Sequence, residues 1–335
     1  MILYDEEKPI GLSGFGMHIP VRESKAARTF RELCQHPVLG PLKGSWHRRT
    51  ETGGIGRQDL LRVHSPGYVE RLYSDALRLE VLKTYELVNE DGSYQRFSPQ
   101  EAERPLEEVF EQALYKTSGT WQCCRTALET GFCFFFGGGM HHGHWDRGKG
   151  FCLINDVVIA LRKLQAAGEI ERAWVIDVDA HKGDGTAALT QDDDSITTFS
   201  VHMAGGWPLD EPEFDSSGRM NPSFQPSDID VPVEGNGEQS YLQGLEDGLK
   251  QLDGYVRPDL ALVLSGADPY EGDELESAGE LKLSLDTLLR RDQRIYTFLE
   301  QRGIPKAYVM SGGYGEGTWR VYTQFLVWVL TRLYA

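Results

Sequence analysis

The side chains best suited to chemistry lie where an apolar run, Ala173–Val178, leads into acidic residues and a histidine. Alternate residues of an extended chain point to the same side, so Asp177, Asp179 and His181 face one way. Two carboxylates and an imidazole at the end of a buried strand need a compensating positive charge. Because Asp179 and His181 offer suitable ligands for Zn²⁺, this segment predicts a divalent metal site. A solvated turn is the competing interpretation.

A second apolar run, Leu260–Leu264, is followed by Asp268. This carboxylate is a candidate third ligand. Three protein ligands with one position open for water are typical of a catalytic zinc site. Since Asp is also common in turns, Asp268 has weight only in combination with the first segment.

Two adjacent histidines, His141 and His142, follow the apolar run 132–136 and three glycines. Imidazoles titrate near neutral pH, so this pair suits acid and base catalysis. Asp177 and Asp184 are candidates to orient the two rings. His144 is instead interpreted as a surface loop residue.

Tyr314 lies between glycines after the apolar run Ala307–Met310. Its hydroxyl can donate a hydrogen bond to a developing oxyanion. A packing role is the alternative for a tyrosine in a loop.

The elements that position these residues are short apolar runs separated by helical patterns. Near-continuous hydrophobicity predicts strands buried on both faces of a parallel sheet. Helices are expected over 156–167, 284–301 and 319–333, and strands over 132–136, 173–178, 196–201, 260–264 and 307–310. We therefore expect one α/β domain over 1–335, with a central, mostly parallel sheet flanked by helices and the active site at the carboxyl ends of the strands.

Composition excludes several classes of protein. The 335 residues carry a net charge of -17 and no obvious basic run, so no nucleic-acid partner is expected. The sequence lacks signal-peptide features and its apolar runs are too short to cross a bilayer. With five cysteines and no Cys-x-x-Cys pair, we expect a cytoplasmic protein with no membrane partner. The polar segments 84–105 and 209–230 are expected to be long surface loops, and the oligomeric state stays open.

Taken in order, these segments resemble the zinc-dependent histone deacetylase family of the arginase–deacetylase superfamily, and most closely its class IV members. The matching motifs are GGGMHH at 137–142, DRGKGFC at 146–152, VIDVDAHKGDG at 175–185, SGADPYEGDEL at 265–275 and SGGYG at 311–315. Several spaced motifs in one order are far more specific than any single motif.

The resemblance implies a role for each matching position. It implies that Zn²⁺, or Fe²⁺ in the cell, is held by Asp179, His181 and Asp268. His142 is implied as the general base, His141 as an electrostatic group or proton donor and Tyr314 as the donor to the oxyanion, with Asp177 and Asp184 orienting the histidines. The implied walls of an acyl-lysine tunnel are Gly150, Phe151 and Trp207. A structural K⁺ is implied near Asp177, Asp179, His181, Ser200 and Val201.

The implied activity is hydrolysis of an acyl group from the ε-amine of lysine in a protein or peptide. An acetylpolyamine amidohydrolase is the alternative, and an acidic residue at the tunnel rim, sought in 101–107, would favour it. A catalytically inactive acyl-lysine binder is a weaker alternative, and an arginase-like enzyme would need a second carboxylate set. Two positions depart from the family pattern: Lys182 stands where most members have histidine, and the stretch SAGE at 277–280 looks inserted.

Overall fold

One parallel sheet organises the chain. The computed structural model describes residues 1–335 except 9, 10, 13, 22, 23 and 236. Within that part, eight strands form one sheet in the order β2-β1-β3-β8-β7-β4-β5-β6, and every neighbouring pair is parallel. The expected α/β sheet is therefore confirmed. The strands are β1 Ile2–Leu3, β2 His47–Arg48, β3 Phe132–Phe135, β4 Ala173–Asp177, β5 Ile196–Met203, β6 Ile229–Val233, β7 Leu260–Ser265 and β8 Lys306–Met310.

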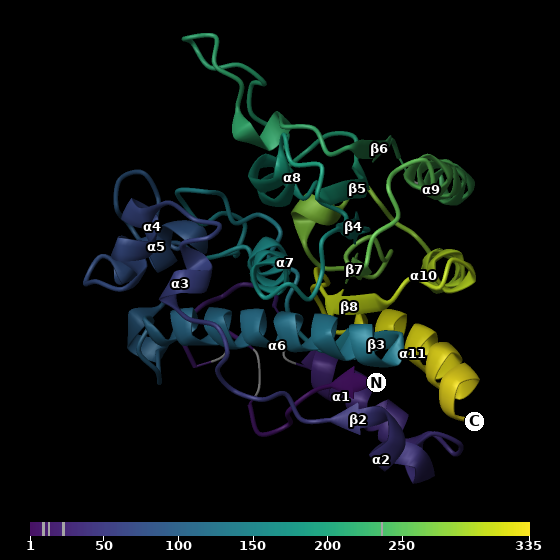
Figure 1. Ribbon diagram of the computed structural model, residues 1–335. Helices are drawn as coiled ribbons and strands as arrows, with labels where there is room; N and C mark the ends of the chain where they lie inside the picture. The colour runs from purple at the N-terminus through teal and green to yellow at the C-terminus, as the bar shows by residue number, and fades with distance from the viewer. Residues whose placement is uncertain (9–10, 13, 22–23, 236) are drawn as a thin grey trace.

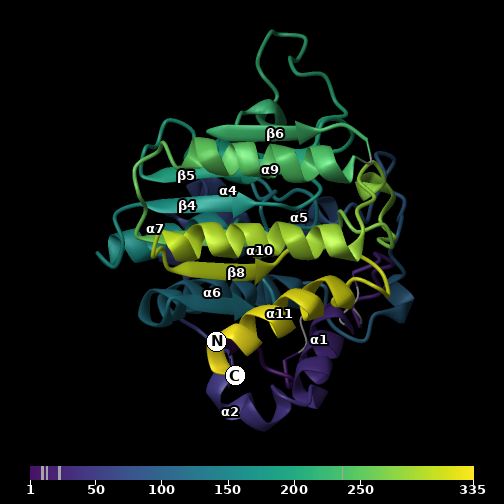
Figure 2. The same cartoon turned by 90° about the vertical axis from the view of Figure 1, so that its right-hand side faces the viewer.

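Helices cover both faces of this sheet. Figure 1 shows α6 and α7 on one side and α9 and α10 on the other, and Figure 2 shows α9, α10 and α11 across the second face. No described helix combines the length and the apolar character needed to span a membrane. The helices are α1 Ser24–Gln35, α2 Lys43–Trp46, α3 Arg57–Leu60, α4 Pro66–Leu72, α5 Leu77–Thr84, α6 Glu108–Thr130, α7 Asp156–Ala166, α8 Asp184–Thr190, α9 Glu238–Leu252, α10 Leu285–Gln301 and α11 Trp319–Tyr334, with short 3₁₀ turns η1 Gly40–Leu42, η2 Pro99–Glu101, η3 Pro222–Phe224 and η4 Glu276–Ala278.

The central strands are apolar throughout because both of their faces are buried. In β4, Trp174 and Ile176 belong to the core cluster that includes residues of α9 and α10. Ala173 and Val175 belong to a different cluster, which includes residues of α6 and α7. Side chains of a strand alternate between faces, so a strand covered on both sides reads as a continuous apolar run.

The elements that sequence patterns did not predict carry weak or mixed signals. Strands β1 and β2 contain two residues each. Strand β6 lies at the sheet edge, contains Pro232 and is partly exposed, and its first two residues end the loop expected over 209–230. The 23-residue helix α6 buries small and polar residues such as Thr117 and Gly119 where a typical amphipathic helix has leucines.

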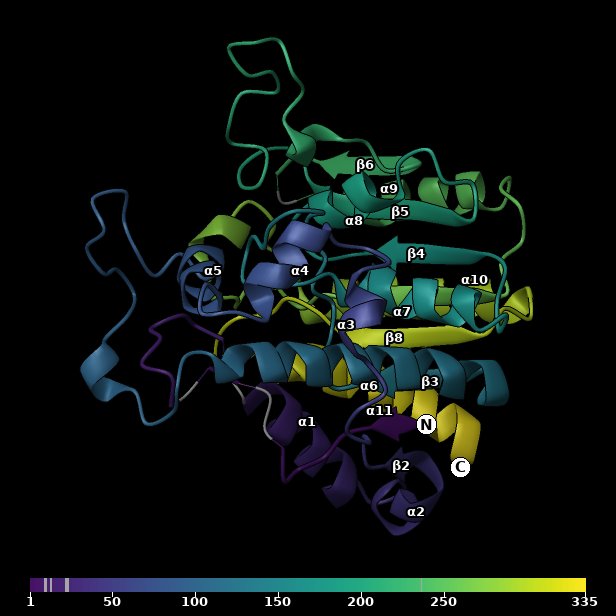
Figure 3. The ribbon, with the colours of Figure 1, turned by 60° about the vertical axis from the view of Figure 1, so that its left-hand side comes forward.

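The order of the strands brings the reactive segments together. Strands β3, β8, β7 and β4 are consecutive neighbours in the sheet. The segments that follow them carry, respectively, the histidine pair, Tyr314, Asp268 and the pair Asp179 and His181. Figure 3 shows β4 and β8 ending on the same side, where the segments 85–107 and 209–221 project beyond the sheet. All of the predicted catalytic segments therefore meet at the end of the sheet where the strands have their carboxyl ends.

The packing of α6 on β3 yields a stability prediction. A Cβ atom added at Gly119 would lie 2.2 Å from Cζ of Phe135. We expect Gly119→Ala to lower the free energy of unfolding by about 1–3 kcal/mol, because overpacking of a closed core displaces side chains or backbone. Gly67 in α4 is the matched control, since its added Cβ meets nothing within 4 Å. Denaturant unfolding measures both variants, and wild-type stability of Gly119→Ala would contradict this packing.

Candidate active site

Three predicted metal ligands form one buried group. Ligand atoms of Asp179, His181 and Asp268 all lie within 4.8 Å of one another. Nδ1 of His181 is 3.2 Å from Oδ1 of Asp179 and 3.0 Å from Oδ2 of Asp268. In the described part of the chain, it is the one group of at least three His, Cys, Asp or Glu residues whose ligand atoms lie this close together. Among the residues that the structure describes, the geometry therefore offers one candidate metal centre and no second carboxylate set of the arginase type.

The charges of this group call for a cation. Burial disfavours a charged ring, but hydrogen bonds to Asp179 and Asp268 raise the pKa of His181 to about 10. Burial and the charge of Asp179 raise the pKa of Asp268 to about 7. Two buried carboxylates thus attract a positive charge. Two oxygen donors and one nitrogen donor match the ligands of a catalytic zinc site, so these residues fit Zn²⁺.

Neighbouring groups fix the carboxylates. Asp179 Oδ2 accepts hydrogen bonds from the Ser311 hydroxyl at 2.9 Å and the Gly312 backbone amide at 2.8 Å. Asp268 Oδ1 accepts one from the amide of Ala180 at 3.1 Å. Each ligand carboxylate is therefore held by groups that follow another strand.

A buried arginine, which the sequence analysis missed, ties together the segments that carry the ligands. Nη1 of Arg291 in α10 donates to the carbonyl oxygens of Val178, at 3.1 Å, and Gly266, at 2.7 Å. The available signal was its place in the helix, since Arg291 lies between Leu288 and Ile295 on the buried face.

Two carboxylates orient the histidine pair. Nδ1 of His141 lies 2.6 Å from Oδ2 of Asp177, and Nδ1 of His142 lies 2.7 Å from Oδ1 of Asp184. Burial opposes charge on His141, but Asp177 and Asp179 raise its pKa to about 9. Burial and neighbouring His141 lower the pKa of His142 to about 3. The His141 ring is therefore cationic near neutral pH. The His142 ring is neutral, and its Nε2 carries no hydrogen because Nδ1 donates to Asp184.

The interpretation of His144 as a surface residue is wrong. His144 is buried, and its Nε2 lies 3.1 Å from Oδ2 of Asp184. The same oxygen accepts a hydrogen bond from Lys149 Nζ at 2.9 Å. A fully buried carboxylate needs several donors, and His142 serves only one of its two oxygens.

The hollow in front of these groups has a volume of about 520 Å³. Gly150, Phe151 and Trp207 line it, and their role as walls of an acyl-lysine tunnel stays a prediction. The Trp207 ring lies 4.5 Å from the His142 ring, measured between centroids. Gly150 has a φ of +54°, and a Cβ there would lie 2.2 Å from Cη2 of Trp207. Only glycine fits between this aromatic wall and the histidine pair.

Tyr314 also lines the hollow. Its backbone amide donates to Asp273 Oδ2 at 2.7 Å, and its carbonyl accepts from the amide of Glu274 at 2.9 Å. Burial, with the charges of Asp179 and Asp268, raises the pKa of its phenol well above the ordinary value. The hydroxyl therefore stays protonated and can donate a hydrogen bond.

The rim of the hollow is acidic, but not through the segment 101–107. Backbone amides of Glu103 and Arg104 donate to Gly14, which holds that segment away from the opening. The charged residues that line the hollow toward its opening are Glu86, Arg96, Asp210, Glu274 and Glu276. Arg96 pairs with Glu86 at 3.0 Å.

The proposed K⁺ site lies beside the group formed by Asp179, His181 and Asp268. Asp177 and Ser200 are direct partners in the register of β4 and β5. Lys182, the departure from the family pattern, is buried and pairs with Asp230 at 3.0 Å. The positive charge at position 182 is therefore compensated, and the K⁺ ligands remain a prediction.

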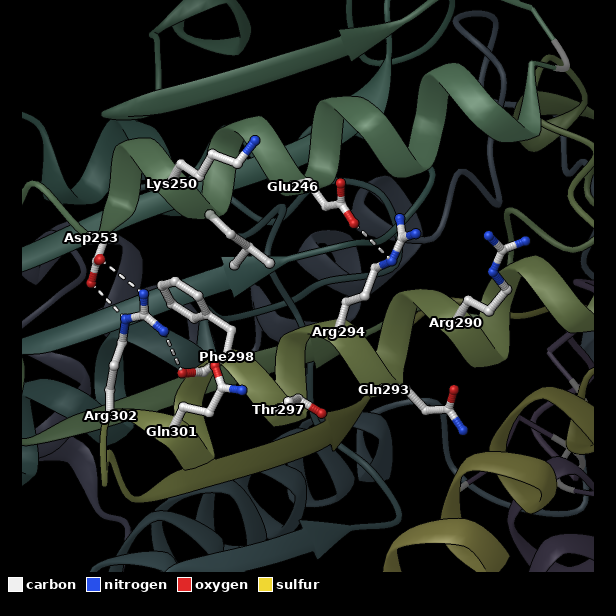
Figure 4. Close-up of a pocket in the computed structure, with 11 residues that line it drawn as sticks. Glu246, Lys250, Asp253, Arg290, Gln293, Arg294, Thr297, Phe298, Gln301 and Arg302 are labelled. Atoms are coloured by element: carbon white, nitrogen blue, oxygen red, sulfur yellow. Dashed lines mark hydrogen bonds and ion pairs between the residues drawn. The ribbon is translucent and has the colours of Figure 1, made fainter.

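Another hollow, of about 480 Å³, lies between α9 and α10. Figure 4 shows two ion pairs among its charged side chains, Arg294 with Glu246 and Arg302 with Asp253. No histidine or cysteine lines it. Two of the predicted catalytic residues, His142 and Tyr314, line the first hollow instead.

Comparison with known proteins agrees with this arrangement. The histone deacetylase domain family matches residues 19–330. Histone deacetylase 2 of Arabidopsis thaliana is 27% identical over 330 residues, covering 96% of this chain and 76% of that protein. An uncharacterized protein of Picosynechococcus is 35% identical over 209 residues, and the match spans 62% of this chain and 64% of that relative.

Two solved structures share the fold. An HDAC homologue from Aquifex aeolicus superimposes with a TM-score of 0.70 at 20% identity, covering 98% of this chain and 82% of that one. The acetylpolyamine aminohydrolase of Burkholderia pseudomallei gives a TM-score of 0.69 at 18% identity and covers 98% of each chain. The family match extends over most of the chain, and the chain belongs to the histone deacetylase family, with the fold of the arginase–deacetylase superfamily.

Proposed function

We propose that this hydrolase is a zinc-dependent amidohydrolase that removes an acyl group from the ε-amine of lysine in a protein or peptide. The observation that carries the proposal is that His142, His181 and Tyr314 line one hollow. His141 lies against His142, and Asp179 and Asp268 complete the buried Asp-His-Asp group behind His181. When bound by Asp179, His181 and Asp268, Zn²⁺ would supply Lewis acidity and lower the pKa of a water molecule to about 7.

The chain's own groups complete the chemistry. Neutral His142 takes a proton from the attacking water at Nε2, since its Nδ1 is held by Asp184. Protonated His141 stabilises negative charge and supplies a proton to the departing amine. The Tyr314 hydroxyl donates a hydrogen bond to the oxygen of the substrate amide as negative charge develops on that oxygen. Each role is inferred from the groups that lie next to the side chain concerned.

The walls of the hollow suit an acylated amine. Acylation removes the charge of the amine, so its aliphatic stem can lie between Phe151 and Trp207. We also propose that residues 1–335 form one catalytic domain, that K⁺ binds beside Asp177 and Ser200, and that the protein acts in the cytoplasm. All five cysteines are unpaired, as a reducing compartment requires.

The first prediction from the proposed function concerns the metal. Wild-type protein should bind one divalent ion per chain, and Asp268→Ala should lose it, because two ligands cannot match the three of a catalytic zinc site. Elemental analysis of purified protein measures this. Asp247→Ala, which changes an exposed carboxylate of α9, is the control and should keep the ion. Full occupancy in an Asp179→Ala, Asp268→Ala double variant would end this assignment.

The second prediction concerns Tyr314→Phe, which keeps the ring and removes only the donor. Loss of one oxyanion donor typically lowers kcat by about 10²- to 10³-fold. We expect that drop with little change in KM and unchanged metal content, measured by steady-state kinetics and elemental analysis. Near-wild-type kcat would show that Tyr314 only packs.

The third prediction separates lysine from polyamine substrates. The acidic rim favours cationic substrates and so supports the polyamine alternative as well as an acyl-lysine flanked by basic residues. The lysine assignment rests on the match to the histone deacetylase domain family. Acetylated lysine peptides and acetylated polyamines should be compared at equal concentration, with a neutral acetyl-lysine amide as control. We expect higher kcat/KM for basic peptides than for polyamines.

Replacing acidic residues of the rim by neutral ones tests the expected preference for cationic substrates. Each exposed pair is worth about 0.2–1 kcal/mol, so Asp210→Asn with Glu276→Gln should raise KM for basic peptides a few-fold. KM for the neutral amide should not change. Preference for acetylpolyamines would replace the lysine assignment, and metal-loaded protein inactive on every substrate would favour the acyl-lysine binder.

A further inference from the structure

The stretch at 277–280, which departs from the family motif, lies at the metal-ligand group. It begins within the 3₁₀ turn η4, between β7 and α10. Leu275, Glu276 and Ser277 line the same hollow as His181 and Tyr314. The segment therefore forms part of the wall of the active site.

One contact joins this segment to a metal ligand. Nδ1 of His181 faces the carboxylates of Asp179 and Asp268, at 3.2 and 3.0 Å. The other ring nitrogen, Nε2, lies 3.1 Å from the hydroxyl oxygen of Ser277. A neutral imidazole that gives its Nδ1 lone pair to a metal carries its proton on Nε2. The Ser277 hydroxyl is placed to accept that hydrogen.

The backbone holds Ser277 in place from both sides. On one side, the amide of Leu275 donates to Asp273 Oδ1 at 2.9 Å. On the other, Ala278 is fully buried in the main core cluster, and its amide donates to the carbonyl of Leu275 at 3.1 Å. The hydroxyl therefore approaches His181 from a fixed turn.

The same segment is tied to the proposed oxyanion donor. Asp273, whose Oδ1 holds Leu275, accepts the amide of Tyr314 with its other oxygen at 2.7 Å. The amide of Glu274 donates to the Tyr314 carbonyl at 2.9 Å. Ser277 is thus positioned by a backbone that also positions Tyr314.

We propose that Ser277 is a positioning residue for the metal: it accepts the Nε2 hydrogen of His181 and so keeps the Nδ1 lone pair directed at the ion. The inference rests on the proposed metal centre and deepens it. Partners of ligand histidines fix the tautomer and the ring orientation, and their loss typically weakens metal affinity about 10- to 100-fold. The inserted stretch then serves metal retention as well as the shape of the hollow.

The test is the affinity of the whole chain for Zn²⁺, measured by competition with a chromophoric chelator. We expect Ser277→Ala to bind Zn²⁺ about 10- to 100-fold more weakly than wild type. Ser277→Thr keeps a hydroxyl and should restore affinity to within a few-fold. Glu280→Gln changes an exposed residue of the same stretch, outside the lining of the hollow, and should bind like wild type. Thermal unfolding verifies that each variant is folded.

The outcomes separate this proposal from the proposed function. If wild type binds Zn²⁺ and Ser277→Ala binds it equally well, the positioning role is overturned while the metal centre stands. A rise in KM with unchanged Zn²⁺ affinity also overturns it and makes Ser277 a tunnel residue only. If wild type binds no divalent ion, the proposed function fails first and the role of Ser277 fails with it. Weaker binding in Ser277→Ala with recovery in Ser277→Thr supports the proposal.

Discussion

Two carboxylates buried at the ends of neighbouring strands impose the constraint on which this protein depends. Asp179 and Asp268 follow β4 and β7, which pair directly in the sheet. Removing such charges from water is costly unless donors or a cation compensate them. Ser311 and backbone amides compensate part of the charge. The remaining negative charge favours a cation at this group.

This constraint spreads outward because the reactive segments are held by partners from other segments. His141 depends on Asp177, and Arg291 binds the backbone beside both ligand carboxylates. A satisfied buried polar network rigidifies its surroundings, and a half-satisfied one destabilises them. The relative positions of the reactive residues therefore depend on the alignment of β3, β8, β7 and β4 more than on the conformation of any single loop.

Sequence predicts the ligands and the central strands because both produce local signals. A buried parallel strand is an apolar run, and an acidic residue at its end interrupts the run visibly. Long-range partners give no such signal: His144 resembled a surface residue because its acceptor, Asp184, lies 40 residues away. Edge strand β6, with a proline and partial exposure, lacks the pattern of a buried strand. The contact of Ser277 with His181 depends on the path of the chain between β7 and α10, which no local pattern defines.

Three of the rim residues stand apart from the groups proposed to perform the chemistry. Glu86, Arg96 and Asp210 belong to the long segments that project beyond the sheet, whereas the metal ligands lie where the chain leaves the central strands. Changes on exposed loops usually alter stability little. Selection can therefore vary the charge around the opening while leaving the reaction intact. A family built in this way can acquire new substrates by changing its loops, with the catalytic centre inherited unchanged.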